Sequence, residues 1–225
     1  MKIIIFDSGT LISFTMAGIV PELIELKKIF DGKFIITSEV KVELVDKPMN
    51  NKRFELEAMK IQQLLDDKVL ELPESIGIKD SEIKREIDSI LKIANNLFTT
   101  KRGPVKLIHF GETSCLALSK ILNKKKIENV IAVDERTTRM LGEKPENLKK
   151  LMERRLHSKI NAKEVNYKFF KEFKFIRSTE LIYVAYKKKL VRFKKGPVLD
   201  ALLYALKFKG AAISSDEISE IKRIG

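Results

Sequence analysis

The apolar residues of this chain fall into short continuous runs separated by longer amphipathic stretches. The short runs are rich in β-branched and aromatic residues, which is typical of strands buried on both faces. Such runs occur at 3–6, 34–37, 69–72, 130–133 and 173–176. Because these strands alternate with helices, the sequence predicts an α/β fold with a central, mainly parallel sheet flanked by helices.

Helical spacing is clearest between 80 and 97, where Ile83, Ile87, Ile90 and Ala94 recur every three or four residues. The other stretches with helical spacing are shorter. They cover 11–17, 21–30, 38–45, 54–67, 111–122, 179–190, 197–208 and a final helix from 214. No repeat or low-complexity linker divides the chain, so a single domain over 1–225 is expected. Residues 143–172 are mostly charged and predict a helical insertion at the surface.

The excess of basic over acidic residues indicates a class of binding partner. The chain has 44 Lys and Arg against 31 Asp and Glu, a formal net charge of +13. Such a field attracts polyanions, nucleic acid first among them, although a densely charged surface also keeps a very stable protein in solution. With no membrane-length apolar run and no basic leader, we expect a cytoplasmic protein with no membrane partner.

Cysteine and histidine are too few for several kinds of site. Cys115 stands alone and cannot form an internal disulfide, and together with His109 and His157 it cannot complete a Cys/His zinc site. The sequence also contains no Gly-x-Ser-x-Gly elbow and no phosphate-binding loop. Acyl transfer and nucleotide-driven work are therefore poorly supported.

Carboxylates are the residues that the predicted fold brings together. Asp7 and Asp134 each follow a buried strand, and Glu43 and Glu112 lie in helices that begin near the same edge of the sheet. Each has a plainer interpretation, because Asp and Glu commonly cap or begin helices or lie in solvent. Clustered acids repel unless a cation joins them, and a set with oxygen ligands alone favours Mg²⁺ or Mn²⁺. A metal at such a site activates water for phosphodiester hydrolysis.

Four segments in this order resemble the PIN domain family, the metal-dependent ribonuclease fold that is also found in VapC-type toxins. They are FDSGTLISF, FIITSEVKVELV, GETSCLALSK and VIAVDERTTRML, and the closing pieces FIRSTELIYVAYKKKL and LDALLYALKFKGAAISSDEI are similar to one prokaryotic branch of that family. The resemblance covers most of the chain except 143–172 and part of 75–104. It implies a PIN-like fold and an endoribonuclease that uses Mg²⁺ or Mn²⁺.

The resemblance also assigns roles to individual residues. It implies that Asp7, Glu112 and Asp134 bind metal, and that Glu43 holds or orients metal or water. Glu135 is then a supporting acid, and Ser8 a neighbour that hydrogen-bonds the site. Two features depart from the family. Most members have Asp where this chain has Glu112, and free-standing toxins of this fold are shorter.

Several alternatives stay open on the sequence alone. Asp200 and Asp216 form a rival acidic pair, although 16 positions between them leave little room for a helix, turn and strand. The substrate is expected to be single-stranded RNA. The alternatives are a non-catalytic RNA-binding or ribonucleoprotein factor that kept the fold, and a toxin whose antitoxin covers the acidic crevice. A homodimer is also left open.

Overall fold

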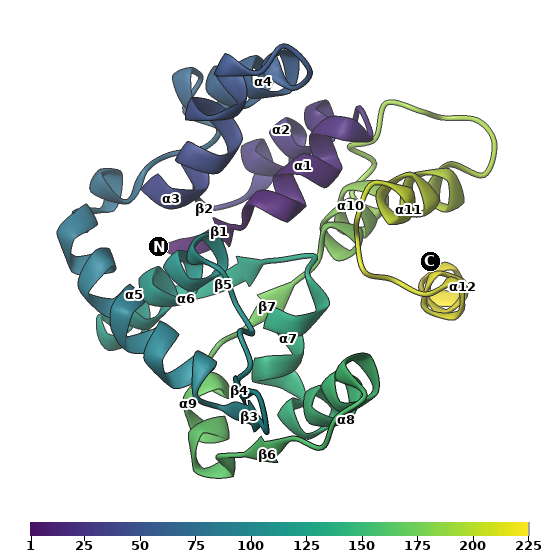
Figure 1. Ribbon diagram of the computed structural model, residues 1–225. Helices are drawn as coiled ribbons and strands as arrows, with labels where there is room; N and C mark the ends of the chain where they lie inside the picture. Colours follow the sequence, from purple (N-terminus) through teal and green to yellow (C-terminus); the bar gives the residue numbers. More distant parts are fainter. Residues whose placement is uncertain (225) are drawn as a thin grey trace.

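A four-stranded parallel sheet lies at the centre of the computed structural model, which describes residues 1–224 (Figure 1). Its order is β2 (Gly32–Ile35), β1 (Lys2–Phe6), β5 (Glu128–Ala132) and β7 (Phe175–Ile176). The predicted α/β class with a parallel sheet flanked by helices is confirmed.

The central strand β1 is apolar because both of its faces are covered. Ile3, Ile4, Ile5 and Phe6 are all buried. Ile5 is paired with Ile35 of β2 on one side, and Phe6 is paired with Ala132 of β5 on the other. Since neighbouring parallel strands end at the same edge, the residues after β1, β2, β5 and β7 lie along one edge of the sheet.

Helices cover the sheet in two groups. In the first group, α6 (Phe110–Lys124) packs against β1 and β5, and α5 (Asp80–Asn95) packs outside it. In the second, α2 contacts β2, α10 contacts α1, α2 and α11, and α11 carries α12. The second group comprises α1 (Ser8–Met16), α2 (Val20–Ile29), α10 (Ser178–Lys187), α11 (Val198–Phe208) and α12 (Ser215–Ile224). Figure 1 shows these two groups at different sides of the sheet.

The segment after β2 is helical but irregular. It contains α3 (Ser38–Lys41), a π-helix (Val42–Asp46) and a 3₁₀ turn (Pro48–Asn50), followed by α4 (Glu55–Asp66). The predicted strand at 69–72 is wrong. The amides of Val69 and Leu70 both donate to the Leu64 carbonyl and close the end of α4, so that only Glu71 bridges to Ile35. A 3₁₀ turn (Pro73–Ile76) follows.

Three very short strands form a second, antiparallel sheet that the sequence did not predict. They are β4 (Gly103–Pro104), β3 (Phe98–Thr100) and β6 (Asn161–Ala162), in that order. Two or three residues per strand give no alternating pattern to recognise, and β4 includes a proline, which strand predictions disfavour.

The charged segment 143–172 packs onto the main core through a minority of its residues. It follows α7 (Arg136–Glu143) and contains α8 (Pro145–Leu156), β6, a 3₁₀ turn (Glu164–Asn166) and α9 (Tyr167–Phe170). The side chains that it buries in the common core are those of Leu148, Met152, Ile160, Tyr167 and Phe170. Most of its charged residues are exposed.

Within residues 1–224, no single helix is both long and apolar enough to cross a membrane. The sharply bent pair α1 and α2 passes that test together, by length and composition only.

Candidate functional site

Asp7 lies at the end of the central strand and is almost completely buried. Its backbone N–H donates to the Ala132 carbonyl at 2.9 Å, which extends the pairing of β1 and β5 by one residue. Its Oδ2 accepts the Gly9 N–H at 3.1 Å and so caps α1, as the plainer interpretation expected. Its Oδ1, however, is buried without any hydrogen-bond partner. Capping therefore accounts for only half of this carboxyl group.

The surroundings of Asp7 disfavour its negative charge. Its pKa is raised to about 7, first because burial removes the carboxylate from water and then because the Glu112 carboxylate lies nearby. The backbone amides of Gly9 and Ser8 oppose this rise, and Glu43 adds to it. Ser8 thus reaches the site through its backbone amide.

Glu43 reaches the same region from a π-helix. The regular turns of α3 change at Val42, and the Lys47 N–H bonds back to the Val42 carbonyl across five residues. Such π-bulges occur frequently at functional sites, because the extra residue redirects the side chains around it. A Cβ atom on Gly111 would lie 2.8 Å from Oε2 of Glu43, so the Glu43 carboxylate rests against the α6 backbone at a position that only glycine leaves open.

Two small polar residues hold α3 against α6. Thr37 caps α3 by accepting the Val40 N–H, and its hydroxyl lies 2.6 Å from the hydroxyl of Ser114. Ser114 also donates to the Gly111 carbonyl. This buried bridge positions the Glu43 helix over the first turn of α6.

Glu112 lies in the first turn of α6, where its carboxylate accepts the His109 backbone N–H. Its pKa is raised, mainly by burial and further by the carboxylates of Glu135 and Glu43. Cys115, one turn further along α6, is fully buried, and its thiol pKa is raised by burial and then by Asp7, Glu112 and Glu43. Asp7, Glu43 and Glu112 therefore lie close together: Glu43 acts on both of the other acids, and all three charges act on the Cys115 thiol.

Asp134 has different neighbours. It is buried after the end of β5, and its Oδ1 accepts the Ser178 N–H at 2.8 Å, which ties this strand to the start of α10. Its Oδ2 is buried without a partner. The adjacent Glu135 accepts the Thr138 N–H at 2.7 Å and caps α7. At this strand end, the charge of Glu135 helps to raise the pKa of Glu112.

The rival pair lies in the C-terminal helices. Asp200 accepts the Lys222 ammonium at 2.5 Å in an ion pair between α11 and α12. Asp216 is exposed in the first turn of α12, as the sequence suggested for a residue at a helix start.

The donors have the chemistry that Mg²⁺ or Mn²⁺ prefers, and Asp7 and Asp134 each offer a buried oxygen without a partner. Among residues 1–224, however, no three His, Cys, Asp or Glu side chains are grouped closely enough to hold a metal ion. Metal binding would therefore require the acids to move closer together.

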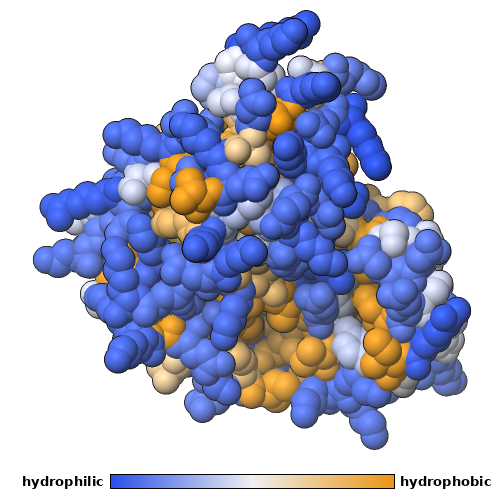
Figure 2. Space-filling view, turned by 90° about the horizontal axis from the view of Figure 1, so that it is seen from below, coloured by the Kyte–Doolittle hydropathy of each residue, from blue (hydrophilic) through white to orange (hydrophobic). Residues whose placement is uncertain are grey.

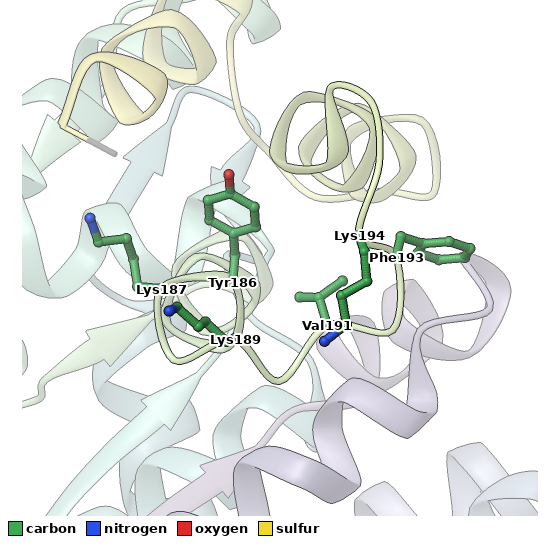
Figure 3. A pocket seen from close by; sticks show the side chains of 6 residues that line it. All are labelled: Tyr186, Lys187, Lys189, Val191, Phe193 and Lys194. Carbon is green, nitrogen blue, oxygen red and sulfur yellow. The ribbon is translucent and has the colours of Figure 1, made fainter.

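Two hollows in the protein lie away from the acids. One, of about 340 Å³, is lined by lysines and aromatic rings at the end of α10 and the loop after it (Figure 3). Its residues are Tyr186, Lys187, Lys189, Val191, Phe193 and Lys194. Asp134 contacts the other end of α10, about 15 Å away along a ten-residue helix. The second hollow is mainly apolar and lies between α11 and the end of α1. Figure 2 shows a largely hydrophilic face that includes a patch of apolar residues.

Comparisons with protein-family models, curated proteins and solved structures find no match to this chain.

Sequence reasoning missed the residues that position the acids. Thr37, Gly111 and Ser114 carry no charge, and their value lies in contacts between segments some 75 residues apart in sequence. The glycine directly before Glu112 was the available signal, since a helix that begins with glycine allows another chain to approach closely.

Proposed function

We propose that this protein is a metal-dependent ribonuclease of the PIN type. The observation that carries the proposal is the Asp7 carboxyl group, which is buried at the end of the central strand with one oxygen unpartnered and its pKa raised by neighbouring acids. Carboxyl groups with strongly shifted pKa values cluster at functional sites, and capping of α1 uses only one of the two Asp7 oxygens. The order of the acidic segments along the chain agrees with the resemblance to PIN domains.

Asp7 and Asp134 would hold a Mg²⁺ or Mn²⁺ ion through their free oxygens, and Glu112 would complete the set after a rotamer change. Such an ion neutralises the acids and lowers the pKa of a bound water. Glu112, the acid whose charge acts most strongly on Asp7, would share the charge of that ion with it. Glu43, held against Gly111, would orient that water.

Single-stranded RNA is the substrate class that the surroundings favour. Phe110, directly before Gly111 and Glu112, is 62% exposed at the start of α6 and offers a face on which a base can stack. The chain's net charge of +13 supplies attraction to phosphates.

The test is cleavage of end-labelled single-stranded RNA with Mn²⁺ or Mg²⁺ by the wild type and by Asp7→Asn. We expect the variant to lose at least about a hundredfold in rate, because ligand positions in metal sites tolerate little change. Asp200→Asn is the matched control, since Asp200 is an Asp in an exposed ion pair with Lys222, and its rate should stay near that of the wild type.

Mn²⁺ should also raise the melting temperature of the wild type but not that of Asp7→Asn, since a ligand that binds only the folded state stabilises it. Equal cleavage by wild type and Asp7→Asn, or no cleavage by either with both metals, would overturn the nuclease proposal.

A non-catalytic RNA-binding role is the second candidate. It is favoured by the lack of a three-residue metal group within residues 1–224 and by the use of Asp134 to tie β5 to α10. RNA binding by the wild type without cleavage and without a Mn²⁺-dependent rise in melting temperature would support this role.

A further inference from the structure

A third hollow, larger than the other two, is a groove of about 760 Å³ that begins just beyond the acidic edge. One wall consists of α7 and α8, and the other of the segment that leads into α12; α8 is at the lower right and α12 at the right of Figure 1. Its basic residues are Arg136, Arg139, Lys144, Lys150 and Arg154. Its acidic residues are Glu143 and Glu217, and Glu217 is already bound by Arg177 at 2.7 Å.

The groove is connected to the acidic edge through the backbone. The Ala212 N–H approaches the Asp134 carbonyl at 3.4 Å, and the Ala212 carbonyl in turn accepts from the Arg139 guanidinium at 3.4 Å. Arg136 directly follows Glu135, which acts on Glu112. The groove therefore adjoins the acidic edge at Asp134 and Glu135.

Most of the cations that line the groove lack an acidic partner within residues 1–224. Among residues 1–224, Arg136, Lys144, Lys150 and Arg154 form no ion pair, whereas Arg177 nearby is bound by both Glu180 and Glu217. Arg139 has a buried Nε without a hydrogen-bond partner, and its pKa is lowered by burial and by the neighbouring Arg177. The other four cations are exposed, and exposed cations without an ion pair are available to neutralise the phosphates of an anionic polymer.

The arrangement of the cations distinguishes a polymer from a single phosphate. Lys144 and Arg154 stand at either end of α8, about 15 Å apart at the rise of a helix, with Lys150 between them. Donors around one phosphate converge on a point, whereas these follow a line. The groove has no aromatic side chain, so it offers contact to a backbone rather than stacking for bases.

We propose that this groove binds the phosphate backbone of single-stranded RNA and leads it to the acidic edge. The inference rests on the proposed function for the identity of the polymer. It concerns binding, however, so it can fail or succeed independently of cleavage.

The experiment measures binding of a labelled single-stranded RNA by fluorescence anisotropy in EDTA, where no metal-dependent cleavage occurs, over a range of salt concentrations. The test variant is Lys150→Gln/Arg154→Gln, on the groove face of α8. The control is Lys149→Gln/Arg155→Gln on the same helix, which removes the same charge from residues that do not line the groove. Circular dichroism confirms that both fold.

We expect the groove variant to bind about tenfold more weakly near 0.1 M salt. The slope of log K against log salt should become shallower by about 1.4, since each phosphate contact on a single strand contributes roughly 0.7. The control should lie close to the wild type. Equal losses in the two variants would overturn the proposal, because they would report net charge alone.

Poly-glutamate serves as the competitor that separates an acidic polypeptide from RNA. If it displaces RNA at matched charge, the groove is a protein-docking surface and the proposal is wrong. Cleavage that depends on Asp7 with binding that ignores the groove would leave the nuclease intact and overturn the groove. Groove-dependent binding without cleavage would support the groove and overturn the nuclease proposal.

Discussion

Asp7 and Asp134 occupy equivalent places in the fold, yet their surroundings differ. Each is a buried aspartate that follows a strand, and β1 and β5 are neighbours in the sheet. Asp7 accepts one local hydrogen bond and stands near the charges of Glu112 and Glu43, whereas Asp134 accepts a hydrogen bond from Ser178, which lies 44 residues away in sequence. Position at a strand end brings a carboxylate to the edge, and the neighbours decide what it does there.

This difference separates electrostatic strain from structural support. Around Asp7, burial and like charges make the ionised folded protein less stable than it would be with a neutral group. Asp134 instead joins two elements that are distant in sequence. Removing the charge of Asp7 should therefore stabilise the protein, whereas removing the hydrogen-bond acceptor of Asp134 should destabilise it.

The largest effect is expected for Asp7→Asn at alkaline pH. The folded-state pKa of about 7 lies above the ordinary 3.8, so ionisation of Asp7 costs stability as pH rises from about 4 to 7, and the cost is complete above 7. Asn keeps an acceptor for the Gly9 N–H and avoids this cost. At pH 8 the variant should be more stable, by up to about 4 kcal/mol.

Urea denaturation of both proteins at pH 4 and pH 8 measures this difference. The gain should be large at pH 8 and small at pH 4, where Asp7 is protonated in the folded state. A gain of the same size at both values would show that the charge of Asp7 is not its source. Asp200→Asn should show no comparable gain.

A loss of stability is expected for Asp134→Ala. The buried Ser178 N–H would lose its acceptor, which costs about 1–3 kcal/mol. Asp134→Asn keeps an oxygen at that position and should recover most of the loss. Thermal denaturation of the two variants at one pH decides the matter, and equal losses would indicate that the tie to Ser178 contributes little.

The sequence predicted the parallel sheet and the placement of Asp7 because both follow from local patterns. An apolar run gives a buried strand, and a polar residue after it lies at the sheet edge. The sequence favoured Asp134 over Glu135 as a site residue. That the charge of Glu135 acts on Glu112 depends on three-dimensional neighbours, which two adjacent acids at a strand end do not reveal. The contact of Glu43 with Gly111 depends on a π-helix that no hydrophobic period reveals.

Glu112→Gln tests the difference between the two aspartates further. It should relieve the electrostatic strain on Asp7 and leave the hydrogen bond between Asp134 and Ser178 in place. The glutamine oxygen can still accept the His109 N–H, while the charge that most affects Asp7 after burial disappears. The pKa of Asp7 should therefore fall toward its ordinary value. Titration of the Asp7 carboxyl carbon by NMR measures the change. An unchanged pKa would mean that burial alone sets it.

The smallest effect is expected for Gly111→Ala, which acts on Asp7 only through Glu43. The new Cβ would meet the Glu43 carboxylate at 2.8 Å, and that carboxylate is the far end of a flexible side chain that can move aside. Since alanine also favours a helix by about 1 kcal/mol over glycine, overall stability should change by less than about that amount. Displacement of Glu43 should nevertheless lower the pKa of Asp7 slightly, because Glu43 is one of the charges that raise it.

A double-mutant cycle isolates that step. In the Glu43→Gln background the moved side chain is neutral, so Gly111→Ala should no longer lower the pKa of Asp7. The same NMR titration reads all four proteins. If Gly111→Ala lowers the pKa equally in both backgrounds, the alanine acts by opening the site to water rather than through Glu43, and the close approach of α3 to α6 has no electrostatic consequence for Asp7.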